Sequence, residues 1–147
     1  KSRVGLFREA DVIFPEDNLY DRYQAGEHYD VIIADEAQFF TPEQIDQLRQ
    51  IVDEADLPVL CFGLRTDFLT HLFPGSRRLM ELADSITEIK TVCACGSKAT
   101  VNARLDASGT ILTTGSQVFL GGNDSYVAMC HRCWRKKIQA QQKSNLN

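Results

Sequence analysis

Two adjacent acidic residues are the first candidates for chemistry, because they follow directly after an apolar run. Asp35 and Glu36 come after segment 29–34, which is rich in branched aliphatic residues. At the carboxyl end of a strand in an open α/β sheet, an Asp commonly holds Mg²⁺, and a neighbouring Glu can act as a general base. The spacing alone fits two solvated acids equally well. Other parts of the sequence must therefore decide between these two readings.

Two cysteine pairs, Cys93-Ala-Cys95 and Cys130-His-Arg-Cys133, form the second candidate site. Zinc binds four thiolates in a tetrahedron, and four protein ligands leave no position open for water. In an intracellular protein, paired cysteines are more often metal ligands than disulfides. The spacing predicts a closed structural zinc site. The alternatives are free or disulfide-bonded thiols, or His131 in place of one cysteine.

The elements around the acidic pair are predicted to form a βαβ unit. The apolar run 29–34 has the length of a buried strand, and 57–63 is a second such run. Between them, Thr41 fits a helix N-cap, Pro42 the first helical position and Gln44 the reciprocal residue of a capping box. The two strands should lie parallel with a right-handed crossover.

Beyond residue 63 the pattern is less regular. Ser76 is expected to cap a helix, and the alternation over 85–92 predicts a third strand. A hairpin is expected between 99–105 and 110–114, around a turn-rich tetrapeptide. The polar stretch 139–147 is expected to be frayed.

These elements predict an α/β part and a small β-rich lobe. We expect the α/β part to cover residues 1–92, the lobe bounded by the cysteines to cover 93–138, and a polar tail to cover 139–147. The lobe is too short to build a core of its own, so a metal would substitute for one.

Composition and charge argue against several classes of protein. The 147 residues are 44% hydrophobic and 24% charged, as in ordinary globular domains. No stretch approaches the roughly 20 apolar residues of a membrane span, and segment 1–10 lacks the apolar core of a signal peptide, so a cytoplasmic location is expected. A net charge of −4 argues against nucleic acid as a partner, although segment 132–137 is basic.

Several motifs together resemble one family. They are segments 31–40, 63–68 and 120–126 and the paired cysteines, in this order and spacing. The combination is similar to the zinc-containing thymidine kinases of bacteria and animal cytosol. The resemblance implies a partial P-loop-type parallel sheet and a lobe that carries zinc and a substrate-covering loop. It also implies transfer of the ATP γ-phosphate to the 5′-hydroxyl of thymidine, and a homo-oligomer, either a dimer or a tetramer.

The resemblance also assigns roles to the acidic segment. In the family the Glu of this motif is the catalytic base, a role that falls on Glu36, while Asp35 lies at the Mg²⁺-ATP side. The set expected to contact ATP and Mg²⁺ comprises Asp35, Glu36, Ala37 and Gln38.

The same resemblance implies a nucleoside pocket. Phe68 matches the aromatic residue that packs on the thymine ring, and Tyr126 matches the tyrosine that contacts the sugar. The glycines of the covering loop allow close approach of its backbone to the base. The set expected to bind substrate comprises Gln38, Phe39, Arg65, Phe68, Phe119, Leu120, Gly121, Gly122 and Tyr126.

One expected motif is absent from the sequence. The family binds phosphate with a Gly-rich loop that ends in Gly-Lys-Ser/Thr, and the 147 residues contain none. We expect the chain to be part of a longer protein and to be inactive as a kinase by itself. The alternatives are a degenerate homologue and a non-catalytic zinc-ribbon module. A helicase, whose acidic motif is similar to segment 35–38, would need a longer and less acidic chain.

Overall fold

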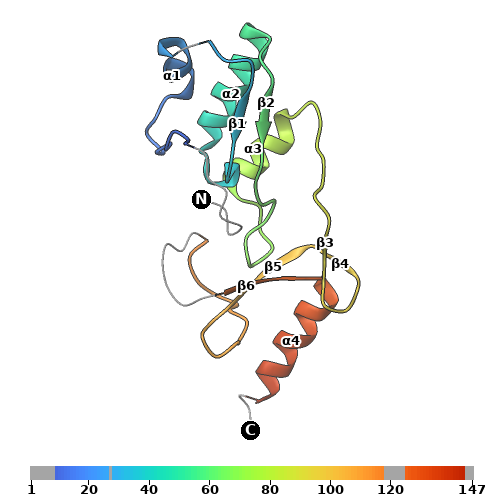
Figure 1. Ribbon diagram of the computed structural model, residues 1–147. Coiled ribbons are helices and arrows are strands. Elements are labelled where there is room, and N and C mark those ends of the chain that lie inside the picture. The colour runs from blue at the N-terminus through green and yellow to red at the C-terminus, as the bar shows by residue number, and fades with distance from the viewer. Residues whose placement is uncertain (1–8, 27, 118–124, 145–147) are drawn as a thin grey trace.

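A computed structural model describes residues 9–26, 28–117 and 125–144. One half contains helices and a parallel strand pair, and the other contains antiparallel strand pairs and the last helix. Figure 1 shows the two halves joined by an extended segment. No helix within the described ranges is long and apolar enough to cross a membrane. The mixed α/β class with a small β-rich lobe is confirmed.

The βαβ unit forms as predicted, with shorter strands. Strand β1 (Ile32–Ala34), helix α2 (Pro42–Ala55) and strand β2 (Val59–Cys61) follow one another, and the strands pair in parallel. Helix α2 begins with the predicted capping box. The Gln44 amide donates to Thr41 Oγ1, and the Thr41 amide donates to Gln44 Oε1, both at 3.1 Å.

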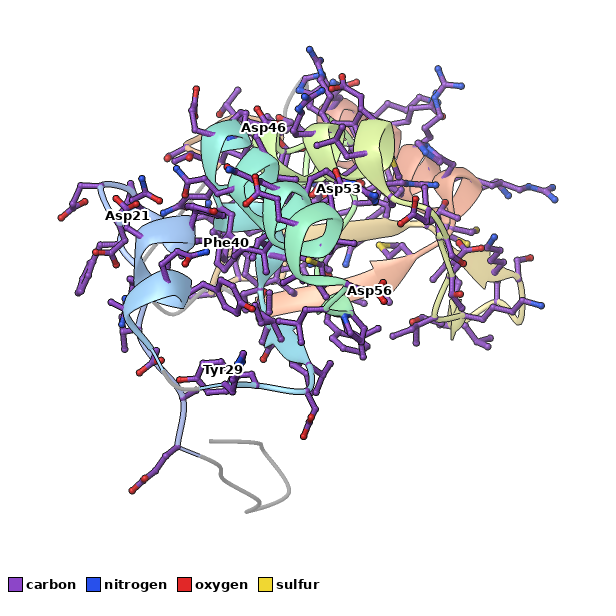
Figure 2. The ribbon with its side chains drawn as sticks, turned by 90° about the horizontal axis from the view of Figure 1, so that it is seen from above. Asp21, Tyr29, Phe40, Asp46, Asp53 and Asp56 are labelled. Carbon is purple, nitrogen blue, oxygen red and sulfur yellow. The ribbon has the colours of Figure 1, made fainter. Side chains whose placement is uncertain are left out.

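Helix α2 covers one face of the strand pair. Helix α1 (Leu19–Ala25) packs on α2, and α1, α2 and the segment before β2 share a hydrophobic core. Figure 2 shows Asp46 and Asp53 on α2 and Asp56 at its end. The core consists of Leu19, Ile45, Leu48, Ile51 and Leu57, with Ile32, Val59 and Cys61 packed against it.

Helix α3 (Pro74–Leu82) starts earlier than predicted. Its N-cap is Phe73, so Ser76 does not cap it but lies within its first turn and donates from Oγ to the Leu64 carbonyl at 2.6 Å. Pro74 explains the difference, because proline is favoured at the first helical position and keeps the preceding residue extended. The resulting contact fixes α3 against the segment that follows β2.

The predicted strand over 85–92 is wrong for most of its length. Only β3 (Thr91–Val92) forms, and it pairs with β4 (Lys98–Ala99). The side chains of Ile86 and Ile89 are 63% and 78% exposed. Alternation alone did not make a strand here, because no neighbouring strand lies beside residues 85–90 in the described part of the chain.

The predicted hairpin forms at its turn and in the residues next to it, where Leu105 bridges Ile111 and the Leu112 amide donates to the Arg104 carbonyl at 2.9 Å. The Asp106 carboxylate accepts from the amides of Ser108 and Thr110, which closes the turn. The main partner of β5 (Val101–Leu105) is instead the later strand β6 (Ser125–Met129), in antiparallel register.

Helix α4 (His131–Ser144) continues through residues predicted to be frayed. Its side chains Trp134 and Ile138 pack on the apolar face of β5. Near its end, the Gln141 side chain accepts from the Ile111 amide at 3.0 Å and donates to the Ile111 carbonyl at 3.2 Å. This tertiary contact explains why the polar segment 139–144 is helical.

Candidate functional site

The acidic pair lies at the carboxyl end of β1, as predicted. Asp35 and Glu36 are both exposed, and Asp35 Oδ1 accepts from the Glu36 amide at 2.9 Å. Glu36 has φ 51° and ψ 36°, the left-handed region that few residues other than glycine, Asn and Asp adopt. Backbone strain of this kind clusters at functional sites. It turns the chain sharply from β1 into the 3₁₀ helix Ala37–Phe39, labelled η1.

Gln38 connects Glu36 to the neighbouring strand. Its side chain is buried, and Nε2 donates to Glu36 Oε2 at 2.5 Å. Its Oε1 accepts from the Leu64 amide at 3.0 Å, just beyond β2. Ala37, predicted to lie at the ATP side, is also buried, and its amide donates to the Phe62 carbonyl at 2.8 Å. Gln38 and Ala37 thus fix the segment that carries Glu36.

A cavity of about 390 Å³ lies next to η1, and Gln38 is one of its lining residues. Phe39 and Phe73 are among its lining residues, with ring centroids 5.6 Å apart and planes at 84°. Phe39, which the resemblance assigns to the nucleoside pocket, lines this cavity together with Phe73 and Gln117, which the sequence analysis did not single out. Phe73 directly precedes Pro74, as the helix N-cap Thr41 precedes Pro42, and this pattern could have marked Phe73 as the residue before a helix. The two rings contact each other edge to face, so a flat ring such as a nucleobase would pack against the face of one of them.

Other predicted substrate residues lie outside this cavity. Phe68 is only 2% exposed and lies beneath the Arg104 guanidinium, and Arg65 is exposed after β2. Tyr126 is half exposed on β6, opposite Arg104 in the strand register. Phe119, Leu120, Gly121 and Gly122 lie outside the described residues.

The cysteine pairs come together as predicted. The Sγ atoms of Cys93, Cys95, Cys130 and Cys133 lie within 4.8 Å of one another, and Cys95 Sγ is 3.7 Å from Cys130 Sγ. A tetrahedron with Zn–S bonds of about 2.3 Å has edges of about 3.8 Å, so the donor set fits zinc. Cys93 and Cys95 follow β3, while Cys130 lies between β6 and α4 and Cys133 lies in the first turn of α4.

The thiols are unequal in acidity. Hydrogen bonds from the Ser97 hydroxyl and amide lower the pKa of Cys95 to about 6. Hydrogen bonding with Cys95 and Cys130 raises the pKa of Cys133 to about 12. Metal binding requires thiolates, so it would release the remaining protons.

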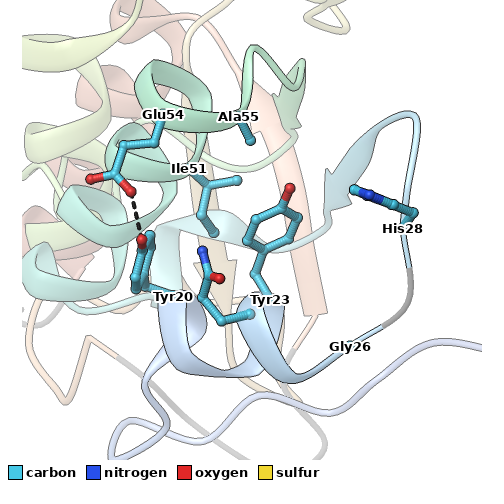
Figure 3. Close-up of a pocket in the computed structure, with 8 residues that line it drawn as sticks. Tyr20, Tyr23, Gly26, His28, Ile51, Glu54 and Ala55 are labelled. Atoms are coloured by element: carbon cyan, nitrogen blue, oxygen red, sulfur yellow. Dashed lines mark hydrogen bonds between the residues drawn. The ribbon is translucent and has the colours of Figure 1, made fainter.

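A second cavity, of about 360 Å³, lies between α1 and the end of α2 (Figure 3). Tyr20 donates to Glu54 Oε2 at 2.5 Å on one side of it, and His28 lies on another. None of the acidic-motif residues lines it, so we place the candidate site at the first cavity.

Comparison with known proteins decides the family. The family model described as Thymidine kinase matches residues 1–134. The chain belongs to the thymidine kinase family. A thymidine kinase of Ruegeria pomeroyi is 49% identical over 139 residues, covering 92% of this chain and 70% of that protein. Those of Yersinia pseudotuberculosis and Shewanella oneidensis are 48% and 44% identical, with 95% and 93% of this chain and 72% and 73% of those proteins covered.

Proposed function

We propose that this chain carries the nucleoside-binding and general-base part of an ATP-dependent thymidine kinase. The observation that carries the proposal is Glu36, held by the buried Gln38 side chain at a strand end, next to a cavity walled by Phe39 and Phe73. A nucleobase packed against one aromatic ring of this cavity would direct its sugar toward the strand end. Enzymes of this class act mainly by positioning the reactants and neutralising charge.

In the proposed reaction Glu36 accepts one proton. The 5′-hydroxyl oxygen of thymidine attacks the γ-phosphorus, its O–H bond breaks, and the proton passes to a Glu36 carboxylate oxygen. The bond from the γ-phosphorus to the β,γ-bridging oxygen breaks, which leaves ADP and thymidine monophosphate. The Gln38 amide, which donates to Glu36 Oε2, holds the carboxylate in place.

Metal ions have separate roles in this proposal. Asp35, exposed at the end of β1, would hold Mg²⁺, which neutralises phosphate charge when bound with ATP. Zinc at the cysteine cluster is structural, since four thiolates fill its coordination. The family resemblance further suggests a cytoplasmic homo-oligomer that does not bind nucleic acid.

Kinase assays require a phosphate-binding loop, and we propose that the 147 residues alone do not transfer phosphate. A chimera joins the loop-bearing segment of the Ruegeria pomeroyi relative upstream of this chain. In that chimera, Glu36→Gln should lower kcat by about 10²- to 10⁴-fold, the usual contribution of a general base. Glu81→Gln, which changes an exposed acid on α3, is the matched control and should leave kcat unchanged.

The outcomes test the assignment of Glu36 as the general base separately from the thymidine kinase function. A Glu36→Gln chimera that keeps kcat within a few-fold of the parent would refute the base assignment. A parent chimera with no activity on thymidine, and a chain that binds no nucleoside, would favour a zinc-ribbon binding module instead.

A further inference from the structure

The two halves of the protein meet at the loop between β2 and α3. Phe68 in this loop is only 2% exposed, and the Arg104 guanidinium carbon of β5 lies 5.3 Å from the centroid of its ring. Arg104 itself is 4% exposed. A desolvated guanidinium over an aromatic face is attracted by the ring quadrupole. This contact therefore fixes the plane of the Phe68 ring from the opposite half of the protein.

The same arginine holds the segment that leads toward residue 118. Its Nη1 donates to the Ser116 carbonyl at 3.4 Å. A Cβ added at Gly115, where φ is 132°, would lie 3.7 Å from Phe68 Cζ. Segment 115–117 therefore lies against Phe68 and Arg104 together.

A second contact joins the same two segments. Gln117 Nε2 donates to Asp67 Oδ2 at 2.9 Å. Asp67 is buried, and its other oxygen accepts from the amides of Leu69 and His71, each at 2.9 Å. Gln117 also lines the cavity next to the acidic motif. The pair thus links the Phe68 loop to the wall of the candidate site.

Strand alternation explains why Arg104 points this way. Val101, Ala103 and Leu105 form the buried face of β5 that packs under α4. Arg104 is on the other face, paired in register with Tyr126. The cysteine-containing lobe thus presents Arg104 next to Phe68 and Tyr126, two residues that the resemblance assigns to the nucleoside.

We propose that Arg104 is a positioning residue for nucleoside binding, which holds the Phe68 ring and segment 115–117 in one arrangement. This inference rests on the proposed thymidine site. A ring and a loop that are already ordered cost less entropy when the ligand binds. Arg104 acts through Phe68 and through segment 115–117, whose Gln117 side chain lines the cavity, and it takes no part in phosphate transfer.

The test is thymidine binding to the 147-residue chain, measured by isothermal titration calorimetry. Arg104→Met keeps an unbranched apolar stem and removes the guanidinium, and should raise the Kd about tenfold. Arg104→Lys restores a cation over the ring and should recover most of the affinity. Arg135→Met, an exposed position on α4, is the matched control. Hydrogen exchange at the Leu69 and His71 amides should accelerate in Arg104→Met while α2 stays protected.

Gln117→Met provides a second variant if Arg104→Met does not fold, and it should weaken binding about threefold through loss of the Asp67 contact. If the parent and these variants bind thymidine with equal affinity, or if Arg104→Lys does not recover the affinity, the role of Arg104 is refuted while the proposed function stands. Failure of the parent chain to bind thymidine overturns both the inference and the proposed function.

Discussion

The close packing of α3 on the acidic motif gives a quantitative prediction at Gly75. This glycine lies in the first turn of α3, directly over η1. A Cβ there would lie 2.9 Å from the Gln38 carbonyl oxygen, 3.0 Å from that of Ala37 and closer still to that of Phe40. Ordinary carbon–oxygen contacts begin at about 3.3 Å. Gly75→Ala must therefore push α3 away from the backbone that carries Gln38.

Two opposing effects set the size of the change. Alanine at a helical position gains about 0.5–1 kcal/mol relative to glycine. Overpacking costs about 1–3 kcal/mol and sometimes more, and here all three obstacles are backbone atoms that cannot rotate away. We expect a net loss of about 2 kcal/mol, which lowers the Tm by about 6 °C in a chain of this size.

The assay is thermal unfolding of Gly75→Ala followed by circular dichroism, with thymidine binding measured in parallel. Gly26→Ala is the comparison, since φ is −89° at Gly26 and its added Cβ would lie 3.2 Å from the Arg22 carbonyl oxygen, a smaller overlap that should lower the Tm much less. Binding should weaken in Gly75→Ala, because Gln38 moves with its backbone. A higher Tm in Gly75→Ala than in the parent would show that helix propensity dominates, and would refute the close packing of α3 on η1.

Two further predictions concern the cap of α2 and the cysteine cluster. Thr41→Ala removes the acceptor for the Gln44 amide and should cost about 1 kcal/mol in urea unfolding, whereas Thr41→Ser should cost less than half of that. Zinc should be present at one ion per chain. Its removal by a chelator should shift the fluorescence emission of Trp134, the single tryptophan, to longer wavelength. The reason is that Trp134 packs in the core of the lobe next to Cys133 and would become exposed to water when the lobe opens. Absence of bound zinc, or unchanged emission after chelation, would contradict the structural role.

The parts of the fold predicted from the sequence depend on contacts that are local along the chain. The capping box of Thr41 and Gln44 spans one turn of helix, and the side chains alone specify it. The cysteine cluster was predictable for a related reason, since each pair lies in one short segment and zinc geometry requires the two pairs to meet.

The parts that were missed depend on contacts between distant segments. Segment 85–90 alternates like a strand, but among the described residues no strand pairs with it. Segment 139–144 is polar and was expected to be frayed, but it is helical where the Gln141 side chain contacts Ile111. Phe73 becomes relevant only through its contact with Phe39 in the candidate cavity, and Arg104 only through its contact with Phe68 outside that cavity. No local pattern reveals such pairs.

The left-handed backbone at Glu36 means that natural variation at this position is constrained twice. The conformation itself favours glycine, Asn and Asp, whereas the proton transfer that we propose for Glu36 requires a carboxylate that reaches the substrate. In a saturation mutational scan, the ranking of residues at position 36 by stability would therefore differ from their ranking by kinase activity. Asn would fold well without activity, while Glu would be retained in active molecules despite its conformational cost. The residues retained at position 36 can thus show whether a selection acts on stability or on turnover.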